Sequence, residues 1–208
     1  MKVLNSPAIR RMPTYLHKLL RLQKEGRTHV STTELAEYMN TELIVVRKDI
    51  ALTGISGLRR VGYDVDELIT YIKKFLGWQN SINATLIGAG SLGSALLGYD
   101  DFSCYGFNIT SVFDCNPEKV GRMVHGHQVC HIDDMAEELS RNPADVAVIC
   151  VSNASAQQVA DKVVAQGIKY IWNFANVALM VPPEVIIQRE VIAGGLAMLG
   201  VKIKLSSQ

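Results

Sequence analysis

The chain has 208 residues, of which 48% are hydrophobic and 20% are charged, a composition typical of a globular protein and not of a disordered one. No run of about 18 apolar residues is present, which excludes a membrane-spanning helix, and no secretory signal begins the chain, so we expect a cytoplasmic protein. The four cysteines form no Cys-x-x-Cys pair and the histidines lack zinc-ligand spacing. We therefore expect reduced thiols and no metal site.

The net charge of +1 conceals an asymmetry along the chain. Residues 1–77 hold 13 Lys and Arg against 8 Asp and Glu, whereas residues 78–208 hold 8 against 12. A basic first part joined to an acidic second part favours a polyanionic partner for the first.

Residues 1–79 predict a small helical domain. Apolar residues recur at helical spacing over residues 13–24, 31–39 and 42–52. The second and third of these helices, joined by a short turn, have the size of a helix-turn-helix. A glycine-spaced loop over residues 54–62 then fits a β-wing, and a helix over residues 66–76 follows. We interpret this part as a winged helix-turn-helix.

The sequence of residues 80–208 predicts an architecture different from that of residues 1–79. Short apolar runs typical of buried strands lie at residues 84–87, 109–113, 146–151, 170–174 and 185–187, and helical segments at residues 92–97 and 156–164 come between them. Strands alternating with helices indicate an α/β fold with a doubly wound parallel sheet. The stretch that follows Gly121 and carries His125, His127 and His131 is interpreted as a surface connection.

A glycine motif opens this second domain. It follows a predicted strand and begins a predicted helix, which is the context that a dinucleotide-binding turn requires. Asp114 ends the next strand, 21 residues after the last glycine, where an acid binds the adenine ribose hydroxyls and favours NAD over NADP. The expected nucleotide-binding residues are Gly88, Ala89, Gly90, Ser91, Leu92, Gly93 and Asp114.

The basic residues of the first domain predict double-stranded DNA as its partner. Arg47 and Lys48 lie in the second helix of the helix-turn-helix, where they reach base edges or phosphates. Arg59 and Arg60 lie in the wing. Thr32 and Thr33, at a helix start, suit backbone phosphates. Arg10 and Arg11, just before the first helix, complete the expected DNA contacts.

The sequence resembles the Rex family of redox-sensing repressors along nearly its whole length. The matching stretches are residues 46–50 (VRKDI), 61–65 (VGYDV), 87–96 (IGAGSLGSAL), 113–121 (FDCNPEKVG), 167–169 (GIK) and 173–175 (NFA). The resemblance implies a homodimer with a Rossmann-like domain and a C-terminal helix, from Val191 onward, that is swapped between subunits. It also implies binding to inverted-repeat operators, supported by NAD⁺ and released by NADH.

The same resemblance implies further site residues. Tyr63 of the wing joins the DNA contacts. Tyr99 is expected near the nicotinamide, with Ile192 closing that pocket. The other nucleotide contacts implied are Val151, Ser152, Asn173 and Ala175.

The sequence departs from the family pattern at several of these places. Arg60 replaces a wing glycine, Asn176 replaces a proline, and Ser152 replaces a proline after Val151. Val191 replaces the acid that usually pairs with a basic residue of the first helix, which is His17 here. An ion pair between these two positions is therefore impossible in this chain.

Two alternatives remain at this point. A small NAD-dependent dehydrogenase would need a proton donor beside the nicotinamide and room for a substrate domain, and about 130 residues leave little. A nucleotide- or coenzyme A-binding module without a DNA role is the other. The favoured interpretation is a non-enzymatic repressor that senses the NADH/NAD⁺ ratio.

Overall fold

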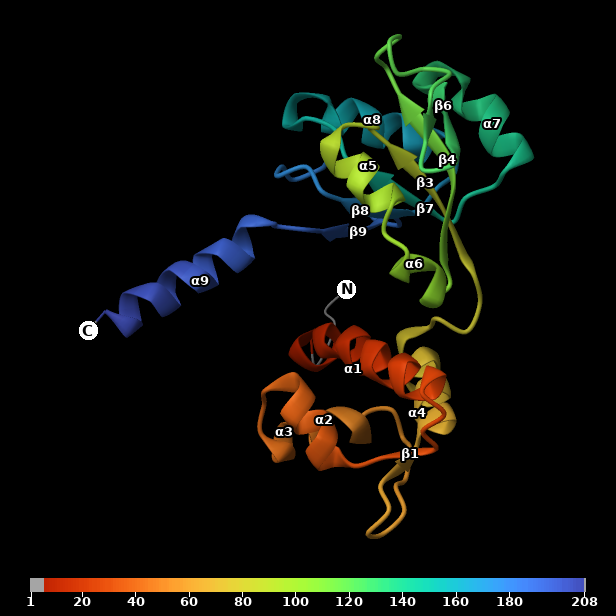
Figure 1. Cartoon of the computed structure of the whole chain (residues 1–208). Coiled ribbons are helices and arrows are strands. Elements are labelled where there is room, and N and C mark those ends of the chain that lie inside the picture. The colour runs from red at the N-terminus through yellow and green to blue at the C-terminus, as the bar shows by residue number, and fades with distance from the viewer. Residues whose placement is uncertain (1–5, 208) are drawn as a thin grey trace. The chain divides into compact units, whose positions relative to one another are not determined.

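In the computed structural model, which describes residues 6–207, the chain divides into two compact units between Asn80 and Ser81. The elements of both units can be followed in Figure 1. The division lies next to the expected boundary after residue 79.

Over residues 6–80, the first unit consists of four helices and a two-stranded sheet. Its elements are α1 (Ser6–Lys24), β1 (His29–Val30), α2 (Thr32–Met39), α3 (Leu43–Ala51), β2 (Tyr63–Asp64) and α4 (Val65–Leu76). The strands β1 and β2 pair antiparallel. This is the expected winged helix-turn-helix, with α2 and α3 as the helix pair.

Local signals set the ends of these helices. The hydroxyl of Ser31 caps α2 by accepting the backbone N–H of Glu34 at 3.0 Å, and Asn40 ends that helix in a left-handed conformation. The carboxylate of Asp64 caps α4 in the same way, and Gly77 ends it with a φ of +73°. These caps therefore set where α2 and α4 begin and end.

The expected start of the first helix at residue 13 is wrong, because α1 begins at Ser6 and contains Pro13. Proline removes one helical hydrogen bond and usually marks a helix start. Here Ala8 and Met12, which precede it, lie on the same buried face as Leu16 and Leu19. Burial of that face extends the helix past its proline.

The second unit is a seven-stranded sheet with helices on both faces. Its elements are β3 (Ile82–Ile87), α5 (Ser91–Leu97), α6 (Asp101–Cys104), β4 (Phe107–Asp114), β5 (Met123–Val124), β6 (His127–His131), η1 (Ile132–Asp134), α7 (Met135–Arg141), β7 (Val146–Ile149), α8 (Asn153–Ala165), β8 (Tyr170–Asn173), β9 (Ile186–Arg189) and α9 (Ala193–Ser206). The strand order is β5-β6-β4-β3-β7-β8-β9. All neighbours are parallel except β5 and β6.

Leaving out the edge strand β5, the six remaining strands have the order β6-β4-β3-β7-β8-β9, which is the order of a dinucleotide-binding Rossmann sheet. The chain leaves β3 toward β4 and later returns to the other side of β3 at β7. Ligands bind such sheets in the crevice where the order reverses, outside the carboxyl ends of the strands. The fold therefore places a ligand site beside the ends of β3, β4 and β7.

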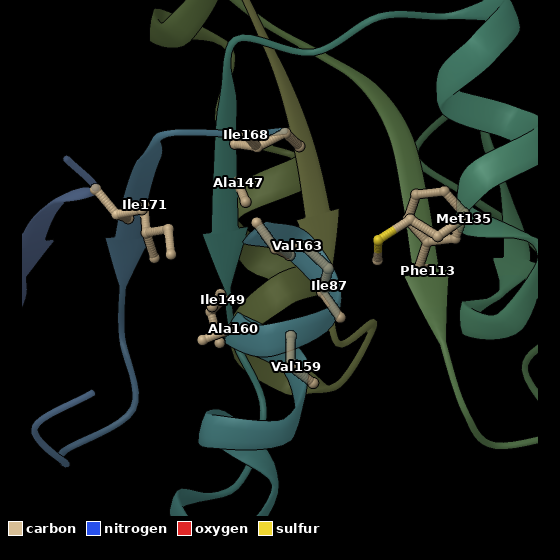
Figure 2. Close-up of a cluster of buried hydrophobic side chains, with 11 residues drawn as sticks. Ile87, Phe113, Met135, Ala147, Ile149, Val159, Ala160, Val163, Ile168 and Ile171 are labelled. Atoms are coloured by element: carbon tan, nitrogen blue, oxygen red, sulfur yellow. The ribbon is translucent and has the colours of Figure 1, made fainter. Parts of the chain in front are cut away.

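Two hydrophobic clusters cover the faces of this sheet. Figure 2 shows the first, in which Val159, Ala160 and Val163 of α8 and Met135 of α7 pack against inward residues of the strands. The second lies on the opposite face, where α5 packs over residues such as Leu86 and Val148. Successive strand residues alternate between the clusters, as the pleat requires.

The expected surface connection after Gly121 is wrong in part, because residues 127–131 form β6. This strand pairs in parallel with β4 through Val129 and Cys130. The sequence of β6 is polar and lacks the apolar run of a central strand. In the structure, only Val129 of its residues is buried. The sequence signal was too weak to distinguish it from a loop.

Over residues 6–207, no helix combines the length and the apolar character that a membrane span requires. In that same part of the chain, no three His, Cys, Asp or Glu side chains gather as a metal site would need.

Candidate nucleotide site and nucleic-acid interface

The glycine turn after β3 is built on close backbone packing. Gly88 has a φ of +101°, and a Cβ there would lie 2.5 Å from the carbonyl oxygen of Cys150. A Cβ on Gly93 would lie 2.0 Å from the carbonyl oxygen of Gly88. In contrast, a Cβ on Gly90 would meet no atom within 4 Å. Two of the glycines therefore serve the fold, and Gly90 leaves open space in front of α5.

Asp114 ties the end of β4 to this turn. Its Oδ2 accepts the backbone N–H of Ala89 and the ammonium of Lys119, each at 2.9 Å, and its Oδ1 accepts the N–H of Asn116 at 2.9 Å. Burial by itself raises the pKa of Asp114, but the hydrogen bonds from Asn116 and Lys119 outweigh it and hold that pKa below its ordinary value. The carboxylate is therefore ionised at neutral pH and fixed in position.

A cavity of about 510 Å³ opens at the carboxyl ends of β3, β4 and β7, where the strand order reverses. This volume falls within the range of small-molecule sites. Its lining residues are Ile87, Gly88, Gly90, Asp114, Cys115, Lys119, His131, Ile132, Asp133, Cys150, Val151, Ser152, Ser155, Gln158, Val159 and Lys162.

Five of the expected nucleotide residues line this cavity, namely Gly88, Gly90, Asp114, Val151 and Ser152. Ala89 serves it indirectly through Asp114. Ser91 and Leu92 form the first turn of α5, where backbone N–H groups have no acceptor within the helix.

The other expected nucleotide residues lie elsewhere. The side chain of Asn173 is buried, and its Oδ1 accepts the N–H of Ala175 at 2.9 Å. The hydroxyl of Tyr99 donates to Asp101 at 3.2 Å, and its ring packs on Phe102. Ile192 is 67% exposed just before α9. Asn173, Ala175, Tyr99 and Ile192 do not line the cavity.

Lys119, His131, Asp133 and Lys162 line the cavity but were not predicted. Lys119 lies five residues after Asp114, a spacing that could have drawn attention to it. The other three come from β6, η1 and α8, which the sheet topology alone brings together.

The three residues of the RKD stretch, which lie on α3, differ in their exposure. Arg47 and Lys48 are exposed, while Asp49 is 3% exposed. Two nitrogens of the Arg11 guanidinium donate to Asp49 at 2.6 and 2.8 Å, and the buried hydroxyl of Tyr15 donates at 2.9 Å. The hydrogen bond to Asp49 raises the pKa of Arg11, and burial raises the pKa of Tyr15. Asp49 therefore anchors α3 to α1.

This network changes the interpretation of Arg11. The sequence predicted a DNA contact, but the guanidinium is bound to Asp49 in the structure. Arg10, beside it, is exposed. We expect Arg11 to position the recognition helix and leave contact with DNA to other cations.

The wing is a tight turn closed between Leu58 and Gly62. The N–H of Leu58 donates to Gly62 at 2.7 Å, and the N–H of Val61 donates to Leu58 at 3.2 Å. Arg59 and Arg60 form the tip, and Arg60 has a φ of +64°. A turn with a positive φ at this position ordinarily takes glycine or asparagine.

A hollow of about 560 Å³ lies between the wing and the helix-turn-helix. Five expected DNA contacts line it together, namely Thr32, Arg47, Arg59, Arg60 and Tyr63. Thr33, Lys48 and Arg10 do not line it, although Thr33 and Lys48 are exposed on α2 and α3. The structure thus joins the recognition helix and the wing into one basic surface.

Replacing Arg60 with glycine is expected to change folding stability and DNA affinity in opposite directions. Relief of the left-handed conformation should stabilise the first unit by about 1 kcal/mol, a rise in Tm of roughly 4–8 °C. Loss of the cation should lower DNA affinity and reduce the slope of log Kobs against log salt by about 0.9 for each phosphate that Arg60 neutralises. Thermal melts and salt titrations of binding measure the two effects.

Arg60→Lys is the matched control, because it keeps both the charge and the strained backbone. It should change neither the Tm nor the salt slope appreciably. Unchanged DNA affinity and slope in Arg60→Gly would show that the wing tip does not touch DNA.

Comparison with known proteins identifies the chain. It is 42% identical over 200 residues to the redox-sensing transcriptional repressor Rex of Treponema denticola, covering 96% of this chain and 95% of that protein. The chain belongs to the Rex family. The Rex protein of Bacteroides fragilis is 36% identical and covers 93% of this chain and 88% of its own.

Two family models match separate parts of the chain. Residues 5–51 match "Putative DNA-binding protein N-terminus", and residues 79–177 match "CoA binding domain". The crystal structure of RSP, a Rex-family repressor, has a TM-score of 0.82 and 32% identity, covering 100% of this chain and 97% of that one. RSP in complex with NAD⁺ and operator DNA has a TM-score of 0.84, with 95% of that chain covered.

These likenesses confirm the Rex resemblance and the expected fold class. Members of this family are transcriptional repressors, so the dehydrogenase alternative is not favoured. RSP has also been solved with NADH, which shows that the two nucleotide forms bind that relative.

Proposed function

We propose that this Rex-family chain is a cytoplasmic, homodimeric repressor that binds an inverted-repeat operator and senses the NADH/NAD⁺ ratio. In this proposal, residues 81–208 bind NAD⁺ or NADH and the first unit binds double-stranded DNA. NADH weakens operator binding more than NAD⁺ does.

The observation that carries the proposal is the nucleotide cavity itself. It combines open backbone at Gly90 with an ionised, fixed carboxylate at Asp114, at the point where the strand order reverses. A pyrophosphate fits against the first N–H groups of α5, and ribose hydroxyls fit the carboxylate. The same chain carries a basic hollow around Arg47 and Arg59. RSP, a solved relative, binds NAD⁺, NADH and operator DNA.

The helix α9 supports the proposed homodimer. No residue of α9 is buried, although Leu196, Met198 and Leu199 are large and apolar. An exposed apolar helix of this kind requires a partner surface. Just before the helix, the carboxylate of Glu190 accepts the indole N–H of Trp172 at 3.2 Å, which holds the connecting segment to β8.

Sensing rests on the charge of the nicotinamide ring, which is cationic in NAD⁺ and neutral in NADH. A ligand shifts a two-state equilibrium only by its different affinity for the two states. An apolar pocket that closes over the ring disfavours the cation by desolvation. We propose that Tyr99 and Ile192, with the partner subunit's copies of them, form that pocket, and that closure changes the spacing of the two recognition helices.

The ion pair expected in the family is not available to hold the closed form. The Nδ1 of His17 lies 3.1 Å from the hydroxyl of Tyr38 within the first unit, and Val191 has no charge. Closure in this chain therefore depends on apolar contacts rather than on a salt bridge between these positions.

The decisive experiment titrates operator DNA with the protein at fixed salt, in the absence of nucleotide and with saturating NAD⁺ or NADH. We expect NADH to lower operator affinity at least tenfold relative to NAD⁺. Arg47→Ala is the control for specific DNA binding, and coenzyme A is the control ligand because residues 79–177 match a coenzyme A-binding model. Equal operator affinity with both dinucleotides would overturn redox sensing, and binding of coenzyme A alone would overturn the choice of ligand.

A further inference from the structure

An ion pair lines the nucleotide cavity. The ammonium of Lys162, on α8, contacts the carboxylate of Asp133, on η1. Both side chains line the same cavity as Gly88 and Asp114. Because α8 follows β7 and η1 follows β6, two strands separated by β4 and β3, the pair joins segments that follow strands on either side of β3 and β4.

The strand order places Asp133 on the side of Asp114 where the base of a dinucleotide belongs. If ribose hydroxyls bind Asp114 and the pyrophosphate lies toward Gly90, the base attached to that ribose points away from the glycine turn. Because β6 lies on the far side of β4 from β3, Asp133, which follows β6, lies on the side of Asp114 away from the glycine turn, and its partner Lys162 lines the same cavity. This placement rests on the nucleotide site proposed above.

We propose that Lys162 and Asp133 read the amino edge of adenine. That edge presents a donor, the N6 amino group, beside an acceptor, N1. A carboxylate accepts hydrogen bonds and an ammonium only donates them, so the side-by-side pair matches the two adenine groups. Hypoxanthine carries an acceptor at position 6 and a donor at N1. Its acceptor would therefore face the carboxylate of Asp133, and its donor would face the ammonium of Lys162.

The surroundings of Asp133 keep the acceptor in place. Its backbone N–H donates to the Nδ1 of His131 at 3.3 Å, which holds the start of η1. The hydrogen bond from Lys162 lowers the pKa of Asp133, so its carboxylate is ionised at neutral pH.

The side chains of Lys162 and Asp133 are both partly exposed, which argues that their pair serves base recognition and not folding stability. The side chain of Lys162 is 37% exposed and that of Asp133 is 66% exposed. An ion pair this exposed contributes little to folding stability. Its removal should therefore leave the Tm unchanged. The variants should lose only the preference for adenine over hypoxanthine.

The experiment measures dissociation constants of NADH and of reduced nicotinamide hypoxanthine dinucleotide by nicotinamide fluorescence. The two ligands differ only in the base. We expect the wild-type protein to prefer NADH about tenfold, on the order of one good hydrogen-bonded base contact. In Lys162→Met and in Asp133→Asn, that ratio should fall to about twofold or less. Lys169→Met is the matched control, since Lys169 is exposed on the same unit but does not line the cavity.

A wild-type protein that binds both dinucleotides equally would overturn the proposal. So would variants that keep the tenfold preference, even if both affinities fell together, because the pair would then only close the cavity. Failure of the wild-type protein to bind either dinucleotide would overturn the nucleotide site as well, which distinguishes that outcome from the others.

Discussion

Gly93→Ala is expected to abolish NADH binding and to destabilise the second unit. The added Cβ would lie 2.0 Å from the carbonyl oxygen of Gly88, and a backbone atom in a tight turn cannot move aside without displacing β3 or α5. Overpacking of this kind costs about 1–3 kcal/mol or more. We expect the NADH dissociation constant to rise at least 100-fold and the Tm to fall by several degrees. Nicotinamide fluorescence and thermal melts measure these effects.

The same variant should lose its response to NADH on operator DNA. Its first unit is untouched, so operator binding should persist whether or not NADH is present. A repressor that NADH no longer releases would tie the nucleotide cavity directly to DNA release.

Gly90→Ala is the matched control. A methyl group there meets no protein atom within 4 Å, so folding should be unaffected. If a pyrophosphate approaches the backbone at Gly90, the methyl group should still weaken NADH binding. Gly90→Ala with full NADH affinity would contradict the proposed path of the dinucleotide, and Gly93→Ala with unchanged stability would contradict the packing account.

Asp49→Ala is expected to weaken both the fold of the first unit and its binding to DNA. The substitution leaves the buried hydroxyl of Tyr15 and the partly buried guanidinium of Arg11 without their acceptor. Removing one partner of a buried, hydrogen-bonded charge pair costs about 3 kcal/mol. For a unit of this size, that cost lowers the Tm by more than about 10 °C. Operator affinity should fall at least tenfold, because α3 loses its attachment to α1.

Two further variants separate positioning from direct DNA binding. Arg47→Ala removes an exposed cation and should lower operator affinity with little change in Tm. Asp49→Asn keeps one oxygen acceptor and should give an intermediate Tm. The positioning role fails if Asp49→Ala melts at the wild-type temperature, since the network would then contribute nothing to the fold.

The sequence predicted the parts of the site that depend on neighbouring residues. The glycines from Gly88 to Gly93 follow a buried strand directly, so one short stretch contains both the turn and the helix start. Asp114 ends the next strand, and parallel strands place their carboxyl ends at one edge.

Predictions failed where a weak local signal was decided by distant partners. The strand β6 has few apolar residues, and it is ordered by pairing with β4. The start of α1 lies before Pro13 because Ala8 and Met12 are buried. In both places, tertiary burial outweighed the local preference.

By itself, the sequence determined the winged helix, the Rossmann sheet, the glycine turn and the kind of protein, because these follow from local spacing and matched motifs. Only the tertiary structure decided how the charges are used. Arg11 is paired with Asp49 rather than free, Lys119 is paired with Asp114, and Lys162 is paired with Asp133. The physical reason is that an ion pair depends on a separation of a few ångströms in space, whereas the partners of the first and third pairs lie 38 and 29 residues apart in sequence.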